Sequence, residues 1–130
     1  MKPPVDAEIY DLPTTTVWID QSGIYCAVSK KEAARTLETA KETLEEFKRI
    51  AGDNKVCVLI DATYAQSSSR EVREYVAEEF PRMFKAIAII SRSTLGKMVA
   101  NIFFTIKSQP YPIKIFNDEA KARIWLKQFL

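Results

Sequence analysis

Hydroxyl-bearing and basic side chains follow two apolar segments of this sequence and form its best candidate for an anion-binding site. One apolar segment ends at Asp61 and the other at Ile90. The candidate residues are Asp61, Ser67, Ser68, Ser69, Ser91, Arg92, Ser93, Thr94 and Lys97. Hydroxyls, cations and the free N–H groups of a helix start together favour a phosphate, a carboxylate or a lipid head group. The alternative is that the serines only cap surface helices whose basic residues are exposed.

Catalysis is not indicated by the same residues. The chain contains no histidine, which excludes Ser-His-Asp and Cys-His catalysis and most zinc or iron centres. A serine without a neighbouring base is a poor nucleophile. We therefore expect no enzymatic activity, no metal and no cofactor. Asp61, at the end of a strand, is expected to anchor its loop through hydrogen bonds to backbone amides.

The composition indicates one ordinary globular domain. The chain has 130 residues, 47% hydrophobic and 28% charged, which suffices for a sizeable apolar core. The net charge of +2 is too small for a nucleic-acid-binding surface, so no nucleic acid partner is expected. Without a long apolar run or a recognisable leader, we expect a cytoplasmic protein with no transmembrane segment. Cys26 and Cys57 lack CxxC spacing and are expected to be buried and reduced.

The N-terminal third predicts a hairpin. Residues 1–13 are expected to form a loose segment or a short edge strand, and residues 14–130 a single domain. Two runs rich in β-branched and aromatic residues, Thr15–Ile19 and Ile24–Val28, are separated by Asp20–Gly23. This arrangement is typical of a β-hairpin.

A long amphipathic helix is predicted next, from a capping box of Ser29 and Glu32 to Gly52. Apolar residues recur behind the box at helical spacing, namely Ala33, Leu37, Ala40, Leu44 and Phe47. The charged face of this helix is expected to be solvated surface rather than a site.

Two strands are predicted to form the centre of the sheet. Val56–Asp61 and Ala86–Ile90 are apolar on both faces, which is typical of strands inside a parallel sheet. The helix between them is predicted from a second Ser-x-x-Glu box, which begins at Ser68, to Pro81. If the two strands are adjacent and parallel, the residues that follow each of them meet at the carboxyl edge of the sheet.

A strongly apolar helix is predicted from Leu95 to Ile106. Its side chains could pack in the core, contact a protein partner or a second copy, or line a ligand pocket, and all three alternatives stay open. The candidate interface or pocket residues are Met98, Phe103, Phe104 and Tyr111.

The last elements complete the fold class. Tyr111–Phe116 is predicted as a strand near a sheet edge because of its prolines, and Asn117 as the N-cap of a final helix. After the hairpin, helices and strands alternate, which favours right-handed crossovers. The predicted class is α/β: a mixed, largely parallel sheet opened by an antiparallel hairpin, with about four helices.

This element order resembles the STAS superfamily. The features that carry the resemblance are the hairpin from Trp18 to Val28, the Val56–Asp61 strand, the serines before a short helix, and the ending Tyr111–Glu119. More closely, the chain is similar to the small bacterial SpoIIAA-like proteins, which are related in fold to CRAL-TRIO lipid-binding domains. The resemblance covers about Thr14 to Leu130 and implies a binding or regulatory module.

The resemblance also implies a site of phosphorylation. In the anti-sigma-factor antagonists of the superfamily, the loop after the Asp-ending strand carries an Asp-Ser-Ser/Thr-Gly motif whose serine is phosphorylated by a partner kinase. The matching stretch here is Gln66–Arg70, which lacks both the Asp and the Gly. Ser68 and Ser69 are therefore candidate phosphosites, with helix capping as the simpler role.

Two functional hypotheses follow. The first is a non-enzymatic binding or regulatory module that acts through a protein partner or as a homodimer, using the apolar helix. The alternative is a carrier or sensor of a lipid-like or anionic small molecule, bound at the carboxyl ends of the core strands.

Overall fold

A six-stranded sheet forms the centre of the computed structural model, which describes residues 1–66, 68–94 and 110–130. Its strands are β1 (Tyr10–Asp11), β2 (Thr15–Ile19), β3 (Tyr25–Ser29), β4 (Val56–Asp61), β5 (Phe84–Ile90) and β6 (Ile113–Phe116), and they lie side by side in chain order. The pairs β1–β2 and β2–β3 are antiparallel, whereas β3 to β6 are parallel. The predicted mixed, largely parallel sheet opened by a hairpin is therefore confirmed.

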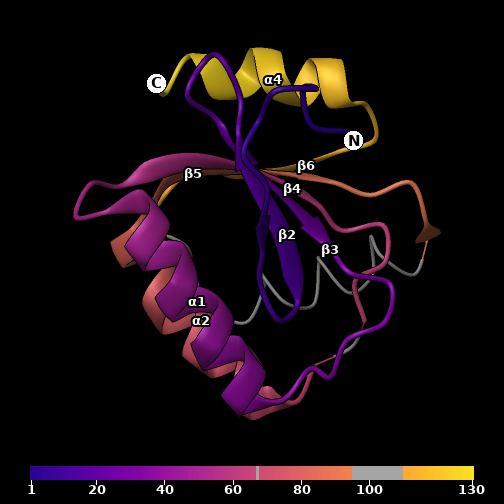
Figure 1. The fold of residues 1–130 in the computed structure, drawn as a ribbon, viewed down its shortest axis with the longest axis vertical. Helices are drawn as coiled ribbons and strands as arrows, with labels where there is room; N and C mark the ends of the chain where they lie inside the picture. Colours follow the sequence, from indigo (N-terminus) through magenta and orange to yellow (C-terminus); the bar gives the residue numbers. More distant parts are fainter. Residues whose placement is uncertain (67, 95–109) are drawn as a thin grey trace.

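The helices cover both faces of the sheet (Figure 1). Helices α1 (Leu37–Ala51) and α2 (Arg70–Met83) lie side by side on one face, and α4 (Glu119–Lys127) lies on the other. Because the crossovers between adjacent parallel strands are right-handed, α1 and α2 are placed on the same face. Three helices are present in the described residues, where about four were predicted. The predicted helix from Leu95 to Ile106 lies outside them.

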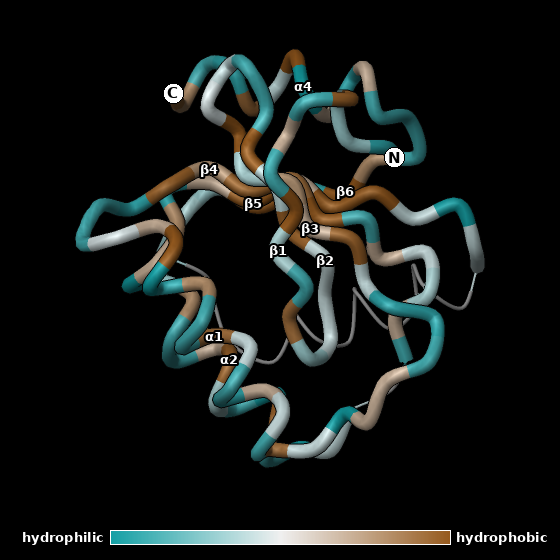
Figure 2. The backbone as a smooth tube through the Cα atoms, in the orientation of Figure 1, coloured by the Kyte–Doolittle hydropathy of each residue, from teal (hydrophilic) through white to brown (hydrophobic). Residues whose placement is uncertain are grey.

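Each face of the sheet has its own apolar core, and the central strands β4 and β5 are largely hydrophobic (Figure 2). In β4, Val58 packs toward α1 and α2, whereas Cys57 and Leu59 pack toward α4. This alternation follows from the two-residue period of a strand, and burial on both faces explains the uninterrupted apolar run. The two cysteines are buried and free of a disulfide, as expected.

The adjacency on which the candidate site depends is confirmed. Strands β4 and β5 pair in parallel, with Ile60 opposite Ile89 and Asp61 opposite Ile90. The ladder continues beyond β4, since Ala62 N–H donates to the Ile90 carbonyl at 2.8 Å. The segments that follow the two strands therefore leave the same edge of the sheet.

Helix α1 begins later than predicted. Ser29 belongs to β3, where it pairs with Thr15, so it is not a helix cap. The N-cap is Thr36, whose hydroxyl accepts the Thr39 N–H at 3.1 Å, while the Thr39 hydroxyl accepts the Thr36 N–H at 3.0 Å. Because the backbone at Ser29 pairs with β2 in the sheet, the helix cannot begin there. It begins instead at the capping box formed by Thr36 and Thr39.

Helix α2 also differs from its prediction at both ends. Its N-cap is Ser69 rather than Ser68, and its last residue is Met83 rather than Pro81. A proline in the last turn removes only one backbone hydrogen bond. Burial of Met83 and Phe84 offsets that loss, so β5 begins at Phe84 instead of Ala86.

The C-terminal elements are shifted slightly from their predicted bounds. Strand β6 begins at Ile113 and forms one end of the strand order, as its prolines suggested. The last helix is capped by Asp118 rather than Asn117, because the Asp118 carboxylate accepts the Ala120 N–H at 2.8 Å. At the other end of the chain, Tyr10–Asp11 forms the edge strand β1.

Candidate ligand-binding pocket

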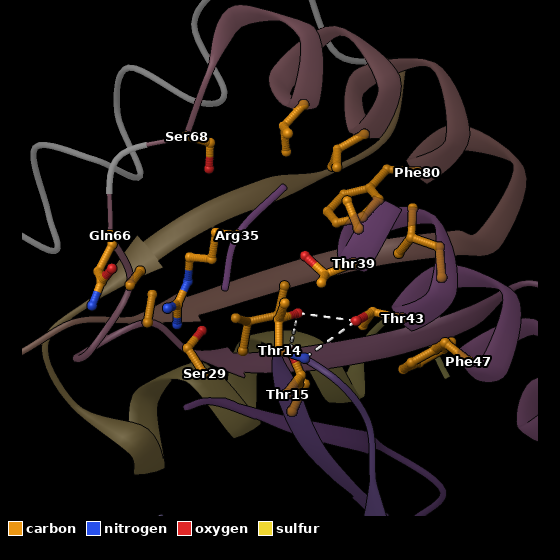
Figure 3. A pocket seen from close by; sticks show the side chains of 18 of the residues that line it. Thr14, Thr15, Ser29, Arg35, Thr39, Thr43, Phe47, Gln66, Ser68 and Phe80 are labelled. Carbon is orange, nitrogen blue, oxygen red and sulfur yellow. Dashed lines mark hydrogen bonds between the residues drawn. The ribbon is translucent and has the colours of Figure 1, made fainter. Parts of the chain in front are cut away.

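A cavity of about 210 Å³ lies between the sheet and helices α1 and α2 (Figure 3). Its floor is the sheet face formed by Ala27, Val58, Ile60 and Ile89. Its walls come from the apolar sides of the two helices, with Ala40, Leu44, Phe47, Val72, Val76 and Phe80. Since an apolar cavity of about 150 Å³ is large enough for benzene, this one can hold a somewhat larger apolar group.

One end of the pocket is aromatic. Phe84, the first residue of β5, packs edge-on against Phe47 with ring centroids 5.3 Å apart and against Phe80 with centroids 5.0 Å apart. All three rings line the pocket, and Figure 3 shows Phe47 and Phe80 at the same end of it. These edge-to-face contacts close that end with apolar surface.

The opposite end of the pocket is polar. Ser29 is the last residue of β3, Gln66 and Ser68 follow β4, and Arg35 precedes α1. Figure 3 shows these four side chains on the side of the pocket away from Phe47. They lie at the carboxyl ends of β3 and β4, the edge at which open α/β sheets bind their ligands. The pocket therefore has an apolar body and a polar end.

Arg35 is the one ionisable side chain among the described residues that line the pocket. Its guanidinium donates to the backbone carbonyl of Lys30 at 2.5 Å and to that of Ala33 at 3.2 Å, which holds the loop between β3 and α1. The side chain is partly buried, and this burial lowers the pKa of Arg35. Across the described parts of the chain, no carboxylate pairs with it. The polar end thus contains a partly desolvated cation without a counter-charge.

Two contacts connect the loops on either side of this end. The Gln66 side-chain amide donates to the Lys31 carbonyl at 3.2 Å. The Lys31 ammonium lies 5.8 Å from the centre of the Tyr64 ring, within range of a cation–π contact. The loop after β3 is therefore tied to the loop after β4 across the rim of the pocket.

The predicted anion site is assembled differently from what the sequence suggested. The loops after β4 and β5 do meet, since the Ser93 hydroxyl donates to the Thr63 carbonyl at 3.3 Å. However, Ser91 is completely buried and its hydroxyl donates to the Ser93 carbonyl at 3.1 Å. The Ser69 hydroxyl accepts the Val72 N–H as the cap of α2. These hydroxyls stabilise the loops, and of the predicted residues that the structure describes, only Ser68 lines the pocket.

Asp61 has the anchoring contacts that the sequence suggested. One carboxylate oxygen accepts the Thr63 N–H at 3.1 Å and the Thr63 hydroxyl at 2.7 Å. The other lies 3.5 Å from the Met1 ammonium. The side chain faces the α4 side of the sheet, as do Cys57 and Leu59, so it does not reach the pocket.

The remaining candidates are placed as follows. Arg92 and Thr94 are exposed, and Tyr111 packs against the core on the α1 and α2 side. The Tyr111 hydroxyl is buried without a hydrogen-bond partner, and burial raises its pKa to about 12. Ser67, Lys97, Met98, Phe103 and Phe104 lie outside the described residues.

Sequence reasoning missed Arg35 and a group of threonines beside the pocket. Thr39 and Thr43 line it from α1 and Thr36 from the N-cap of that helix, while Thr15 begins β2 and Thr14 precedes it. A signal was present, because the three helix threonines recur at helical spacing next to the apolar positions Ala40, Leu44 and Phe47. A polar stripe beside an apolar one indicates a helix face that packs only partly against the hydrophobic core.

The described residues contain neither a metal-binding cluster nor a membrane-spanning helix. Residues 1–66, 68–94 and 110–130 contain no group of three or more Cys, Asp or Glu side chains placed to hold a metal ion. Among the helices in these ranges, none has both the length and the apolar character needed to cross a membrane.

Comparisons with known proteins place the chain by family and fold. The family model described as "Domain of unknown function (DUF7793)" matches residues 17–130. One similar crystal structure is that of an uncharacterized DUF3478 family protein with a SpoIIAA-like fold, from Shewanella loihica PV-4. That protein is 22% identical to this chain, and the two structures superpose with a TM-score of 0.53. The match covers 97% of this chain and 98% of that chain. A second crystal structure, of a protein of unknown function from Arthrobacter sp. FB24, is 25% identical with a TM-score of 0.32. The match covers 92% of this chain and 96% of that chain. No curated protein matches the chain. The first structure shows that the fold is SpoIIAA-like, as the sequence resemblance implied.

Proposed function

The chain belongs to the DUF7793 family, whose description assigns no activity, and we propose that it is a non-enzymatic module that binds a small lipid-like molecule between its sheet and helices α1 and α2. The observation that carries the proposal is the cavity itself, which joins an apolar body to a polar end. Ligand pockets in proteins combine a mostly apolar lining with a few convergent polar groups in this way.

The chemistry of the lining supports binding rather than catalysis. Arg35 is the only titratable group in the described lining, and an arginine stays protonated at neutral pH, so it is a poor general base. The serines at the polar end, Ser29 and Ser68, have no histidine or carboxylate beside them in the described lining to activate a hydroxyl. A ligand held here would be bound and released unchanged.

The proposal is tested by filling the cavity. Ala40 lines the pocket from α1, so Ala40→Phe places a ring inside the space that a ligand would occupy. The matched control is Ala120→Phe, the same change at an exposed helix position on the opposite face of the sheet. We expect octan-1-ol to shift methyl NMR signals of Val58 and Val76 in the wild type and in Ala120→Phe, but not in Ala40→Phe. Unchanged binding to a folded Ala40→Phe protein contradicts the proposal.

Association with a protein partner or a second copy stays a prediction. Of the residues proposed for it, Met98, Phe103 and Phe104 lie outside the described part of the chain, and Tyr111 packs against the core. Light scattering of the wild type and of Phe104→Glu measures it directly. A wild type that is monomeric at high concentration counts against self-association.

A further inference from the structure

We infer that the ligand carries a single carboxylate, bound by Arg35 at the polar end of the pocket with its apolar tail directed toward Phe47 and Phe80. This inference rests on the proposed binding function and adds the chemical class of the ligand. With such a ligand, the protein would be a sensor or carrier of small monocarboxylates rather than of neutral lipids.

The first support is the charge balance around Arg35. Its N–H groups have two described partners, the carbonyls of Lys30 and Ala33, and both are neutral. Of the other cations near this end, Lys30 pairs with Asp11 at 2.6 Å, and Lys31 lies over Tyr64. Arg73, which does not line the pocket, donates to the Ser68 carbonyl. Glu32, the acidic residue of the same loop, is exposed and forms no described ion pair with Arg35. One uncompensated positive charge among the described lining residues favours one negative charge on the ligand.

The second support is the hydrogen-bonding capacity of the same end. A guanidinium presents its N–H donors in a plane that matches both oxygens of a carboxylate. Gln66 and Ser68 bring an amide and a hydroxyl to this end, and Ser29 brings a second hydroxyl. These neutral groups can satisfy the remaining lone pairs of a carboxylate, whereas a doubly charged phosphate favours a second cation, which the described lining does not contain.

The third support is the direction and size of the apolar space. The polar end lies at the carboxyl ends of β3 and β4, and the rings of Phe47, Phe80 and Phe84 line the other end. A molecule with its head at Arg35 therefore extends its tail along the floor formed by Val58 and Ile89. The volume of about 210 Å³ fits a short or medium tail and is small for a diacyl lipid.

The experiment compares probes that share one tail and differ in head group. Octanoate, octan-1-ol, octylamine and octyl phosphate are titrated into the wild-type chain by isothermal calorimetry at pH 7.5. We expect octanoate to bind about 10- to 100-fold more tightly than octan-1-ol, the range for a charge-assisted hydrogen bond. Equal binding of octanoate and octanol, or a preference for octylamine or octyl phosphate, overturns the carboxylate assignment while leaving the proposed function intact. Absence of binding by all four probes overturns both.

Variants then assign the preference to Arg35. Arg35→Met should abolish the preference for octanoate over octan-1-ol. Lys31→Met is the matched control, since it removes one positive charge from the same loop outside the pocket lining, and it should keep the preference. Arg35→Lys is included because Arg35 also holds its own loop, and it should keep part of the preference. Retention of the full preference in a folded Arg35→Met protein overturns the assignment.

Discussion

The hydroxyl of Thr43 in α1 lies 3.1 Å from the hydroxyl of Thr14, at the start of β2, and it also accepts the Thr14 N–H at 3.3 Å. These contacts join residues 29 positions apart and connect the first helix to the segment just before β2, beside the pocket. Thr43 is 8% exposed and Thr14 is partly buried, so water would only in part replace the acceptor that the Thr14 N–H loses.

Removal of this contact should destabilise the protein without changing its shape. Thr43→Val keeps the side-chain volume and leaves the Thr14 N–H unsatisfied, which costs about 1–3 kcal/mol. The free energy of unfolding is measured by urea denaturation. Thr16→Val is the control, because Thr16 has no described side-chain hydrogen bond, and it should change stability by less than about 0.5 kcal/mol. Equal effects of the two substitutions would show that the contact contributes nothing specific.

The start of α1 can be tested in solution. Thr36→Ala removes the hydroxyl that accepts the Thr39 N–H and should cost about 1 kcal/mol of unfolding free energy. Ser29→Ala, at the position that sequence reasoning assigned to the cap, should cost less than about 0.5 kcal/mol because that residue lies in β3. The reverse order of the two effects would place the helix start at Ser29.

The buried thiol of Cys26 should make stability fall at alkaline pH. Burial raises the pKa of Cys26 from 9.0 to about 11, although Arg123, whose guanidinium lies 3.6 Å from Sγ, partly opposes the shift. Between these two values the unfolded chain has lost this proton and the native protein has not. The unfolded state then binds fewer protons, so the free energy of unfolding decreases as pH rises from 9 toward 11.

Denaturant titrations from pH 8 to 11 measure this slope. The Cys26→Ala variant should have a shallower decrease over the same interval, because the group that titrates differently in the two states is gone. Raised pKa values at Cys57 and Tyr111 act in the same direction and are retained in the variant. An unchanged slope in Cys26→Ala would mean that its thiol does not contribute.

Tail length should limit affinity for the pocket. Each methylene that enters the cavity contributes about 0.8 kcal/mol, or roughly fourfold in affinity. In the series from butanoate to dodecanoate we expect this gain at first and then a plateau, because a space of about 210 Å³ fills before the longest tail is accommodated. Calorimetry with the wild type measures the series. A gain that continues undiminished to dodecanoate would place the tail outside this cavity.

The sheet could be predicted from the sequence because its signals are strong and local. Val56–Ile60 and Ala86–Ile90 are apolar at every position, which requires burial on both faces and hence helices on each side. The hairpin was predicted from the Asp20–Gly23 connection between two strand-like runs. In the structure the Asp20 carboxylate accepts the Ser22 and Ile24 N–H groups within that turn. Alternation of helices and strands then determined the parallel direction and the handedness of the crossovers.

Tertiary structure alone decided the helix starts and the pocket. A Ser-x-x-Glu pattern at Ser29 is local, and it does not reveal that Thr15, from the other strand of the hairpin, pairs with Ser29. The cavity depends on how far α1 and α2 stand from the sheet, which results from side-chain packing across elements distant in sequence. Arg35 acquires its importance in the same way, since only the fold brings its charge to the apolar space beside Gln66 and Ser68.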